Sequence, residues 1–395
     1  FAKGGTEIGL AVGEGFDRDT ATDPADFADQ FSPFCMFGGR NGERWDMSSP
    51  FGGTMLRLPL RAESDGSRLG DAYTHEKARV LLEGLRARGP ELLLFLKSVR
   101  KIEVYSRGPG GELEGDELEP RLDFCVERRV DGGGEDMHTI AELVKSVPQR
   151  EQLYEQLVAS EPTLEWRSLT MRLVDAPSGQ VAESRWVVCN GLAMTGEMRT
   201  LCLSPDARGS KLIPWAGVAA KVSGDLTVGE HVKGAAFAFL PLPIETGLPI
   251  HINGYFELAT DRERLWTLRE GLTGVAAVKA AWNQAVLNEV VSRCYCKLLC
   301  VLALTSPEAA HSVPNLTRYF KLWPADAAAE PWGGMVKQLY AQLVDQPVLP
   351  LEESMQPGAE SWLKPSQQGD EAPVLRAEQV TTELADLKPA DWKRP

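Results

Sequence analysis

Residues 236–258 read AFAFLPLPIETGLPIHINGYFEL. The stretch contains two apolar runs, and a short segment with Gly247 and Pro249 separates them. Apolar runs of this length that are bounded by Gly and Pro are typical of strands buried in a sheet. The stretch therefore predicts one strand on each side of the turn, at about 235–242 and 249–258.

The sequence on either side of this stretch extends the pattern. Strand candidates occupy 163–175 and 181–190, with the turn Ala-Pro-Ser-Gly between them, and another occupies 212–222. Over about 275–304, apolar residues recur at helical spacing, which predicts a long helix. Its apolar face consists of Leu287, Val290, Val291, Cys294, Leu298, Val301 and Leu302. Strands followed by a long helix indicate an α/β (α+β) fold.

Shorter elements are expected before residue 160. They are a strand at 54–60, helices at about 74–88 and 90–99, strands at 101–106 and 121–129, and a helix at 148–159. Thr74 is a suitable N-cap for the first of these helices and Gly89 a suitable end. Its apolar stripe is formed by Ala78, Leu81, Leu82 and Leu85. Pro90 suits the first position of the second helix, where its missing N–H costs nothing.

The bulk composition is that of an ordinary globular protein. The chain has 395 residues, with 43% hydrophobic and 25% charged residues, a length that predicts two or three domains. No run of about 18 apolar residues is present, so no transmembrane helix is expected. The net charge is −14, from 42 basic and 56 acidic residues. This acidic balance argues against binding to nucleic-acid backbones or anionic membranes.

The cysteines bear on the cellular compartment and on metal binding. Seven cysteines are present, and no signal peptide precedes them, which favours reduced thiols in the cytoplasm. Cys294, Cys296 and Cys300 lie on one predicted helix, where positions two apart point in different directions, so we expect no metal site. Residue 1 is Phe, and we expect the chain to be part of a longer protein.

Nine strings, in order along the chain, carry a family resemblance. They are DQFSPFCMFG (29–38), FGGTMLRLPLR (51–61), ELLLFLKSVRKIEVY (91–105), LIPWAGVAA (212–220), the stretch at 236–258, RLW (264–266), WNQAVLNEVV (282–291), YFKLWP (319–324) and PVL (347–349). Together they strongly resemble the repeating region of the sacsin family. The resemblance covers about residue 25 to about residue 365, and its specificity comes from the number and order of the strings.

The resemblance implies a GHKL-type ATPase module, similar to the amino-terminal half of the ninety-kilodalton heat-shock chaperone. It implies four parts: the C-terminal part of the nucleotide-binding α/β sandwich (1–62), an α/β middle domain (63–274), a helical extension (275–345) and a loosely ordered tail (346–395). ATP and Mg²⁺ are the implied ligands of the complete domain. The implied partners are client proteins and the seventy- and ninety-kilodalton chaperones.

Two Gly-Gly-Thr strings are candidates for the nucleotide site. In FGGTMLRLPLR the resemblance places the late Gly-Thr of the family at Gly53 and Thr54, with Thr54 near the adenine. The alternative is a tight turn at Gly53 and an ordinary strand hydroxyl at Thr54. The other string, GGTEIGLAVG at 4–13, looks like a phosphate lid, but its position favours a strand at Glu7–Val12. The Glu/Asn helix, the D-x-G-x-G turn and the lid of the family would precede Phe1.

The middle domain of the family projects a basic side chain toward the γ-phosphate. In this sequence the matching loop reads ATDRERLW at 259–266, so the resemblance implies Arg262 and Arg264 as catalytic candidates, with Lys221 as a third. Family chains often have an Arg-Arg pair where this chain has Arg-Glu-Arg. The alternative is a solvated charged turn.

The sequence therefore predicts a chaperone-like module in protein folding and quality control, with ATP linkage in the complete parent. Alone, the chain is expected neither to bind nor to hydrolyse ATP well. The alternative is a non-catalytic interaction scaffold with a degenerate GHKL fold; a DNA-acting GHKL relative fits the acidic charge poorly. Seven aromatic residues could form a client-binding surface or pack in the core: Trp215, Tyr255, Phe256, Trp266, Trp282, Trp323 and Trp332.

Overall fold

A computed structural model describes the following parts of the chain. They are residues 72–106, 121–132, 140, 144, 150–223, 232–305, 318–324, 329–346 and 348, and the strand backbone at 2–3, 7–12, 14–19, 54–55, 349–350 and 362–363. The chain divides into two compact units. The first unit comprises Phe1–Ala87, Glu103–Phe124 and Ala176–Ser178, and the second unit comprises Arg88–Ile102, Cys125–Asp175 and Gly179–Pro395. The division at 62, 274 and 345 expected from the sequence stays a prediction.

The first unit contains a four-stranded sheet in the order β3-β2-β1-β4. Its strands are β1 (Ala2–Lys3), β2 (Glu7–Val12), β3 (Glu14–Asp19) and β4 (Thr54–Met55). Strand β2 confirms the strand predicted within GGTEIGLAVG. Strand β4 begins at Thr54, as predicted, and pairs antiparallel with β1; residues 56–60 of the predicted strand lie outside the described residues.

Helix α2 (His75–Leu92) begins as the sequence predicts. The backbone N–H of Lys77 donates to Thr74 Oγ1 at 3.3 Å, so Thr74 is the N-cap. No residue of the apolar stripe expected on this helix is fully buried: Leu81 is 61% exposed, Leu82 is 36% exposed, and Ala78 and Leu85 are half-buried. The helical spacing of these residues therefore did not indicate a buried face.

The helix predicted at 90–99 does not form. Helix α2 continues through Pro90 to Leu92, and the apolar residues Leu93, Leu94 and Phe95 are buried in the turns that follow. Gly89 does not end the helix. It allows close packing, because a Cβ at this position would lie 2.7 Å from Cγ2 of Val126. Tertiary packing, which the local sequence does not encode, decides the ending.

An eight-stranded sheet in the order β11-β10-β12-β9-β8-β7-β6-β5 dominates the second unit, to which β5 and β6 contribute only part of their length. The strands are β5 (Lys101–Ser106), β6 (Arg121–Gly132), β7 (Thr163–Asp175), β8 (Val181–Leu192), β9 (Trp215–Val222), β10 (Ala235–Ala238), β11 (Leu240–Glu245) and β12 (His251–Gly254). The pairs β7–β8, β8–β9, β9–β12 and β10–β11 are antiparallel, and β10–β12 is parallel. These elements confirm the strands predicted between 101 and 222.

Residues 235–258 form three strands where two were predicted. Phe239 adopts a positive φ of +64° and divides the first run into β10 and β11. Strand β11 contains Pro241 and Pro243 and lies at the edge of the sheet. An edge position suits proline, because proline has no N–H to donate to a neighbouring strand.

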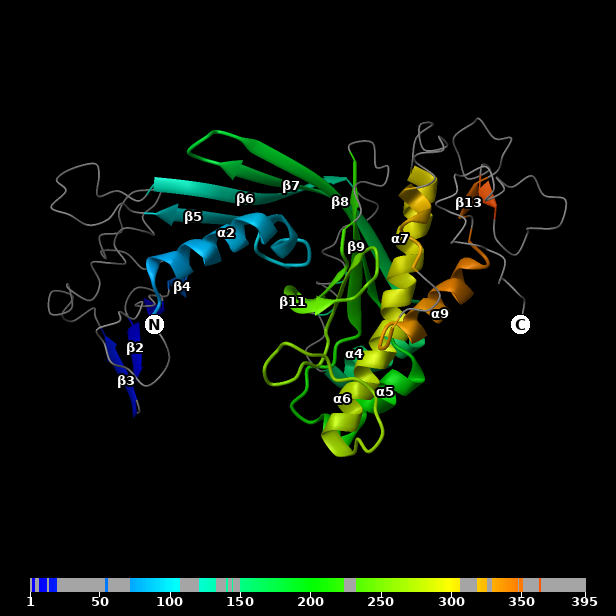
Figure 1. Ribbon diagram of the computed structural model, residues 1–395. Helices are drawn as coiled ribbons and strands as arrows, with labels where there is room; N and C mark the ends of the chain where they lie inside the picture. The colour runs from blue at the N-terminus through cyan, green and yellow to red at the C-terminus, as the bar shows by residue number, and fades with distance from the viewer. Residues whose placement is uncertain are drawn as a thin grey trace, which may run out of the picture. The chain divides into compact units, whose positions relative to one another are not determined.

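The long helix predicted at 275–304 is confirmed, with a π-helical turn in its middle. It consists of α6 (Gly274–Ala285), η6 (Val286–Val291) and α7 (Ser292–Thr305). The seven residues of the predicted apolar face are all buried. Figure 1 shows α6 and α7 in yellow, with α7 along the sheet, where it contacts β7, β8 and β9. Helix α9 (Gly333–Leu343) packs on α7 and η6.

Helix α4 (Arg150–Ala159), which was predicted, contacts α5 (Gly196–Leu203), which was not, and α5 contacts α6. Thr195 caps α5 by accepting the N–H of Met198 at 3.2 Å. The sheet and its helices share one hydrophobic core. The fold is therefore mixed α and β, and no helix in the described ranges is long and apolar enough to cross a membrane.

Candidate functional site

The segment after β12 folds into a short hairpin at 257–266, here named the arginine hairpin. An isolated antiparallel bridge joins Leu258 to Leu265. The N–H of Ala259 donates to the carbonyl of Arg264 at 2.9 Å, and the N–H of Trp266 donates to the carbonyl of Glu257 at 3.2 Å. Backbone hydrogen bonds therefore define the hairpin from its base to its tip.

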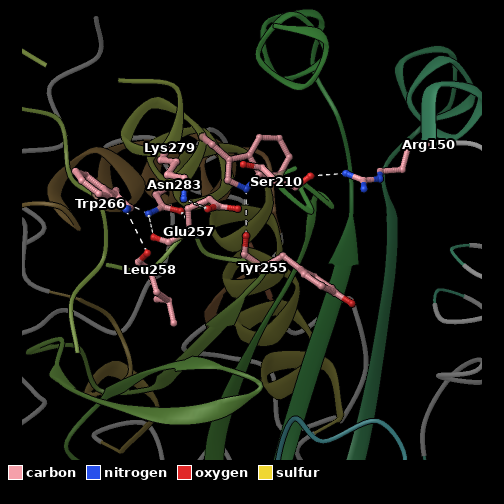
Figure 2. Close-up of polar contacts among 9 residues, drawn as sticks. Arg150, Ser210, Tyr255, Glu257, Leu258, Trp266, Lys279 and Asn283 are labelled. Carbon is pink, nitrogen blue, oxygen red and sulfur yellow. Dashed lines mark hydrogen bonds and ion pairs between the residues drawn. The ribbon is translucent and has the colours of Figure 1, made fainter. Parts of the chain in front are cut away.

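One buried side chain fixes the base of the arginine hairpin to helix α6 (Figure 2). Asn283 Nδ2 donates to the carbonyls of Glu257 and Trp266, at 2.8 and 2.9 Å, and Asn283 Oδ1 accepts the N–H of Glu257 at 2.8 Å. The residue is only 2% exposed. The amide uses both its donors and its acceptor, so it joins the two ends of the hairpin and leaves no polar atom of its own unsatisfied.

Neighbouring residues on the same face of α6 add to this attachment. Lys279 Nζ lies 2.9 Å from a carboxylate oxygen of Glu257, and both side chains are at least three-quarters buried. Trp282 Nε1 donates to the carbonyl of Tyr255 at 3.1 Å. Positions 279, 282 and 283 fall on one helix face, as side chains three and four residues apart do. The base of the hairpin is therefore held at several points.

The structure places both arginines implied by the resemblance at the solvent-exposed end of this hairpin. Arg264 is engaged by Asp261, whose Oδ2 lies 2.8 Å from Nη2. The pKa of Asp261 is lowered, first by the backbone N–H of Glu263 and then by Arg264. Arg262 adopts a φ of +58° and has no ion-pair partner among the residues that the structure describes. Of the two, Arg262 is the better placed to meet an anion.

The third basic candidate lies elsewhere. Lys221 is near the end of β9, whereas the segment leading into the arginine hairpin starts beside Trp215, whose carbonyl accepts the N–H of Tyr255 at 3.1 Å. Six residues of extended strand span about 20 Å. The structure therefore does not bring Lys221 together with Arg262 and Arg264 at one site.

The nucleotide candidates belong to the first unit. Gly53 lies outside the described residues, and Thr54 is the first residue of β4, opposite Lys3 of β1. The adenine-binding role of both stays a prediction. Within the described ranges, no group of three or more His, Cys, Asp or Glu side chains could hold a metal ion.

The seven aromatic residues proposed as a client surface belong mainly to the core. Five are at most 8% exposed, namely Trp215, Phe256, Trp282, Trp323 and Trp332. Tyr255 and Trp266 are half-buried, and Trp266 Nε1 donates to the carbonyl of Leu258 at 3.2 Å. The core interpretation is therefore correct for the five, because their rings complete the packing between sheet and helices.

His251, in β12, occupies an unusual environment for a histidine. It is 2% exposed and stacks on Trp186, with ring centroids 5.4 Å apart. Its Nδ1 accepts the N–H of Ala235 at 3.1 Å, so the neutral ring carries its proton on Nε2. Nε2 lies 3.9 Å from Glu91 Oε1 and has no hydrogen-bond partner within the described part. Burial, assisted by Arg88, lowers the pKa of His251 to about 4.

Sequence reasoning missed the role of Asn283, although a signal was present. Asn283 is a polar residue in the largely apolar string WNQAVLNEVV, and a polar side chain that is buried on such a helix requires hydrogen-bond partners. The identity of those partners could not be read from the string, because Glu257 and Trp266 approach α6 only in the folded protein.

Comparisons with known proteins agree with the resemblance. A family profile described as "Sacsin domain" matches residues 11–116. Human sacsin is 28% identical over 345 residues, which cover 84% of this chain and 7% of sacsin. The chain thus spans a small fraction of the length of this relative, and no solved structure matches it. Together, the profile match and the similarity to human sacsin show that the chain contains a sacsin-like region.

Proposed function

We propose that this chain is a chaperone-like module of a sacsin-type protein that acts in protein folding and quality control in the cytoplasm. The similarity to human sacsin over 84% of the chain supports this proposal. Client proteins and the seventy- and ninety-kilodalton chaperones are the proposed partners. In the complete parent, the module is linked to ATP, with Gly53 and Thr54 near the adenine.

The arginine hairpin is the observation that carries the ATP-linked part of this proposal. Arg262 is exposed and has no ion-pair partner among the described residues, and the hairpin that bears it is fixed to α6 by Asn283. A cation on a fixed support is suited to offset the negative charge that develops during phosphoryl transfer. Arg264 contributes less, because Asp261 already engages its guanidinium.

The test compares arginine variants in the native protein that contains this chain. Arg262→Ala should lower kcat for ATP hydrolysis at least about tenfold with little change in KM, because the interaction forms with the transition state. Arg264→Ala should have a smaller effect. Arg269→Ala, an exposed arginine just beyond the hairpin, is the matched control and should have none. Equal kcat values for wild type and Arg262→Ala would reject the role of Arg262.

The chaperone-like part is tested separately with the 395-residue chain. At equimolar ratio, without ATP, the chain should reduce light scattering by a heat-aggregating enzyme, whereas serum albumin should not. Absence of this effect, together with stable capture of folded partners, would favour the non-catalytic scaffold. The chain alone should turn over little ATP, and turnover at a rate typical of a complete chaperone would contradict the proposed incomplete site.

A further inference from the structure

Three aromatic rings of the second unit surround the ammonium group of one lysine. Lys97 Nζ lies 4.4 Å from the ring centroid of Trp215 and 4.5 Å from those of Phe239 and Tyr255. The ammonium also donates a hydrogen bond to the Tyr255 hydroxyl. Cations within about 6 Å of an aromatic face are attracted by the electrons of the ring. Trp215, Phe239 and Tyr255 are named here the aromatic cage.

The aromatic cage is held by contacts that do not involve the lysine. The rings of Phe239 and Tyr255 meet edge to face with centroids 4.6 Å apart, and Trp215 and Phe239 do so at 6.0 Å. The N–H of Phe239 donates to Asn253 Oδ1 at 2.8 Å, which holds the residue at its positive φ. In Figure 2 the Tyr255 ring extends away from the residues around Asn283, to which its backbone is tied. The cage should therefore persist without Lys97.

The segment that carries Lys97 is also anchored independently of the aromatic cage. Leu93 is fully buried, and Phe95 packs edge to face against Phe237 at 5.1 Å. The buried Arg128 donates to the carbonyls of Leu93 and Leu96, at 2.7 and 2.5 Å. Lys97 itself is exposed, and Phe239 and Tyr255 are half-buried, so the aromatic cage borders on solvent. A second lysine could approach the cage from solvent.

We propose that the aromatic cage is a binding site for a lysine side chain of a partner polypeptide, and that Lys97 is a built-in competitor for it. The occupant that the cage already holds defines the ligand chemistry. The Tyr255 hydroxyl accepts an N–H, which an unmodified lysine can supply and a quaternary ammonium cannot. The net charge of −14 favours the approach of a lysine-rich partner. Strained residues such as Phe239 often occur at functional sites.

The test removes the competitor and measures binding of a defined probe. A Gly-Gly-Lys-Gly-Gly peptide blocked at both ends is titrated into wild-type chain and into Lys97→Ala, and binding is followed by the NMR signal of the Trp215 indole N–H. That N–H is buried and has no hydrogen-bond partner in the described ranges, so its signal should respond to a guest in the cage. The variant should bind at least tenfold more tightly than wild type. The same peptide with acetyl-lysine should not bind.

Two further variants keep the outcome interpretable. Lys97→Gln retains a long side chain if Lys97→Ala is poorly folded, and it should also bind more tightly than wild type. Adding Phe239→Gly to either variant removes one ring at a position where glycine accepts the positive φ, and should weaken binding at least fivefold. Equal affinity of wild type and variant would overturn the proposal. Tighter binding of tetramethylammonium than of the lysine peptide would also overturn it, because the site would then select quaternary ammonium groups.

Discussion

Asn283 and His251 are both polar, both 2% exposed, and differ in how completely their polar atoms are satisfied. The amide of Asn283 makes three hydrogen bonds to the backbone of the arginine hairpin. The imidazole of His251 accepts one hydrogen bond at Nδ1, and its Nε2 has none in the described part of the chain.

The difference has opposite consequences for the two sites. A fully bonded buried amide fixes the chain that it contacts, because breaking the contacts would leave the N–H of Glu257 and the carbonyl of Trp266 without partners. A partly bonded buried imidazole is held neutral, because within the described ranges no hydrogen bond to Nε2 offsets the loss of hydration that its charged form would suffer. The same burial therefore produces a structural attachment at Asn283 and sensitivity to acid at His251.

Replacing the amide should give the largest effect. Asn283→Ala leaves the N–H of Glu257 and the carbonyl of Trp266 unpaired and removes one of the two hydrogen bonds to the carbonyl of Glu257. It should lower the free energy of unfolding by about 3 kcal/mol. Urea unfolding measures this change. Gln338→Ala, an exposed polar side chain on α9, should stay within about 0.5 kcal/mol of wild type. An Asn283→Ala variant as stable as this control would show that Asn283 does not fix the arginine hairpin to α6.

The second largest effect should be a loss of stability in acid that is caused by His251. The pKa of His251 is about 4 in the folded protein, against an ordinary value of 6.5, so between these values the unfolded chain binds a proton that the folded chain does not. The free energy of unfolding should therefore fall as pH falls, by about 2 kcal/mol between pH 7 and pH 5 from this group.

The contribution of His251 is isolated with His251→Asn, whose Oδ1 can still accept the N–H of Ala235. Urea unfolding of wild type and variant at pH 7, 6 and 5 should show a shallower pH dependence in the variant. Burial raises the pKa of Glu91, which acts in the opposite direction, and Glu91 Oε1 lies 3.9 Å from His251 Nε2. The same comparison in a Glu91→Gln background therefore removes the contribution of Glu91. If stability depended on pH equally in both proteins, the pKa of His251 would not be lowered in the folded protein.

The smallest of the three effects belongs to the ion pair beside Asn283. Glu257→Gln, Lys279→Met and the double variant form a cycle that should give a coupling energy of about 1 kcal/mol for this partly buried pair. That is less than the loss expected for Asn283→Ala, because the backbone bonds of the hairpin base remain. A coupling energy as large as the loss of stability in Asn283→Ala would mean that the ion pair contributes as much as Asn283 to holding the arginine hairpin on α6.

The sequence by itself determined the elements whose pattern is local. Alternation predicted β5 at 101–106, turn residues separated β7 from β8, and apolar spacing identified the buried face of η6 and α7. These predictions succeeded because the periods of strands and helices are expressed within a few residues. The family resemblance indicated Arg262 and Arg264 as candidate residues, and both lie in the arginine hairpin.

Only the tertiary structure decided the features that join distant residues. It carried α2 past Pro90, divided the 236–258 run at Phe239, brought Asn283 to the hairpin base and placed Lys97 beside Tyr255, 158 residues away. It also buried His251, which lowers the pKa of that side chain. The physical reason is that hydrogen-bond partners, rings and desolvation come from neighbours in space, which local spacing does not encode.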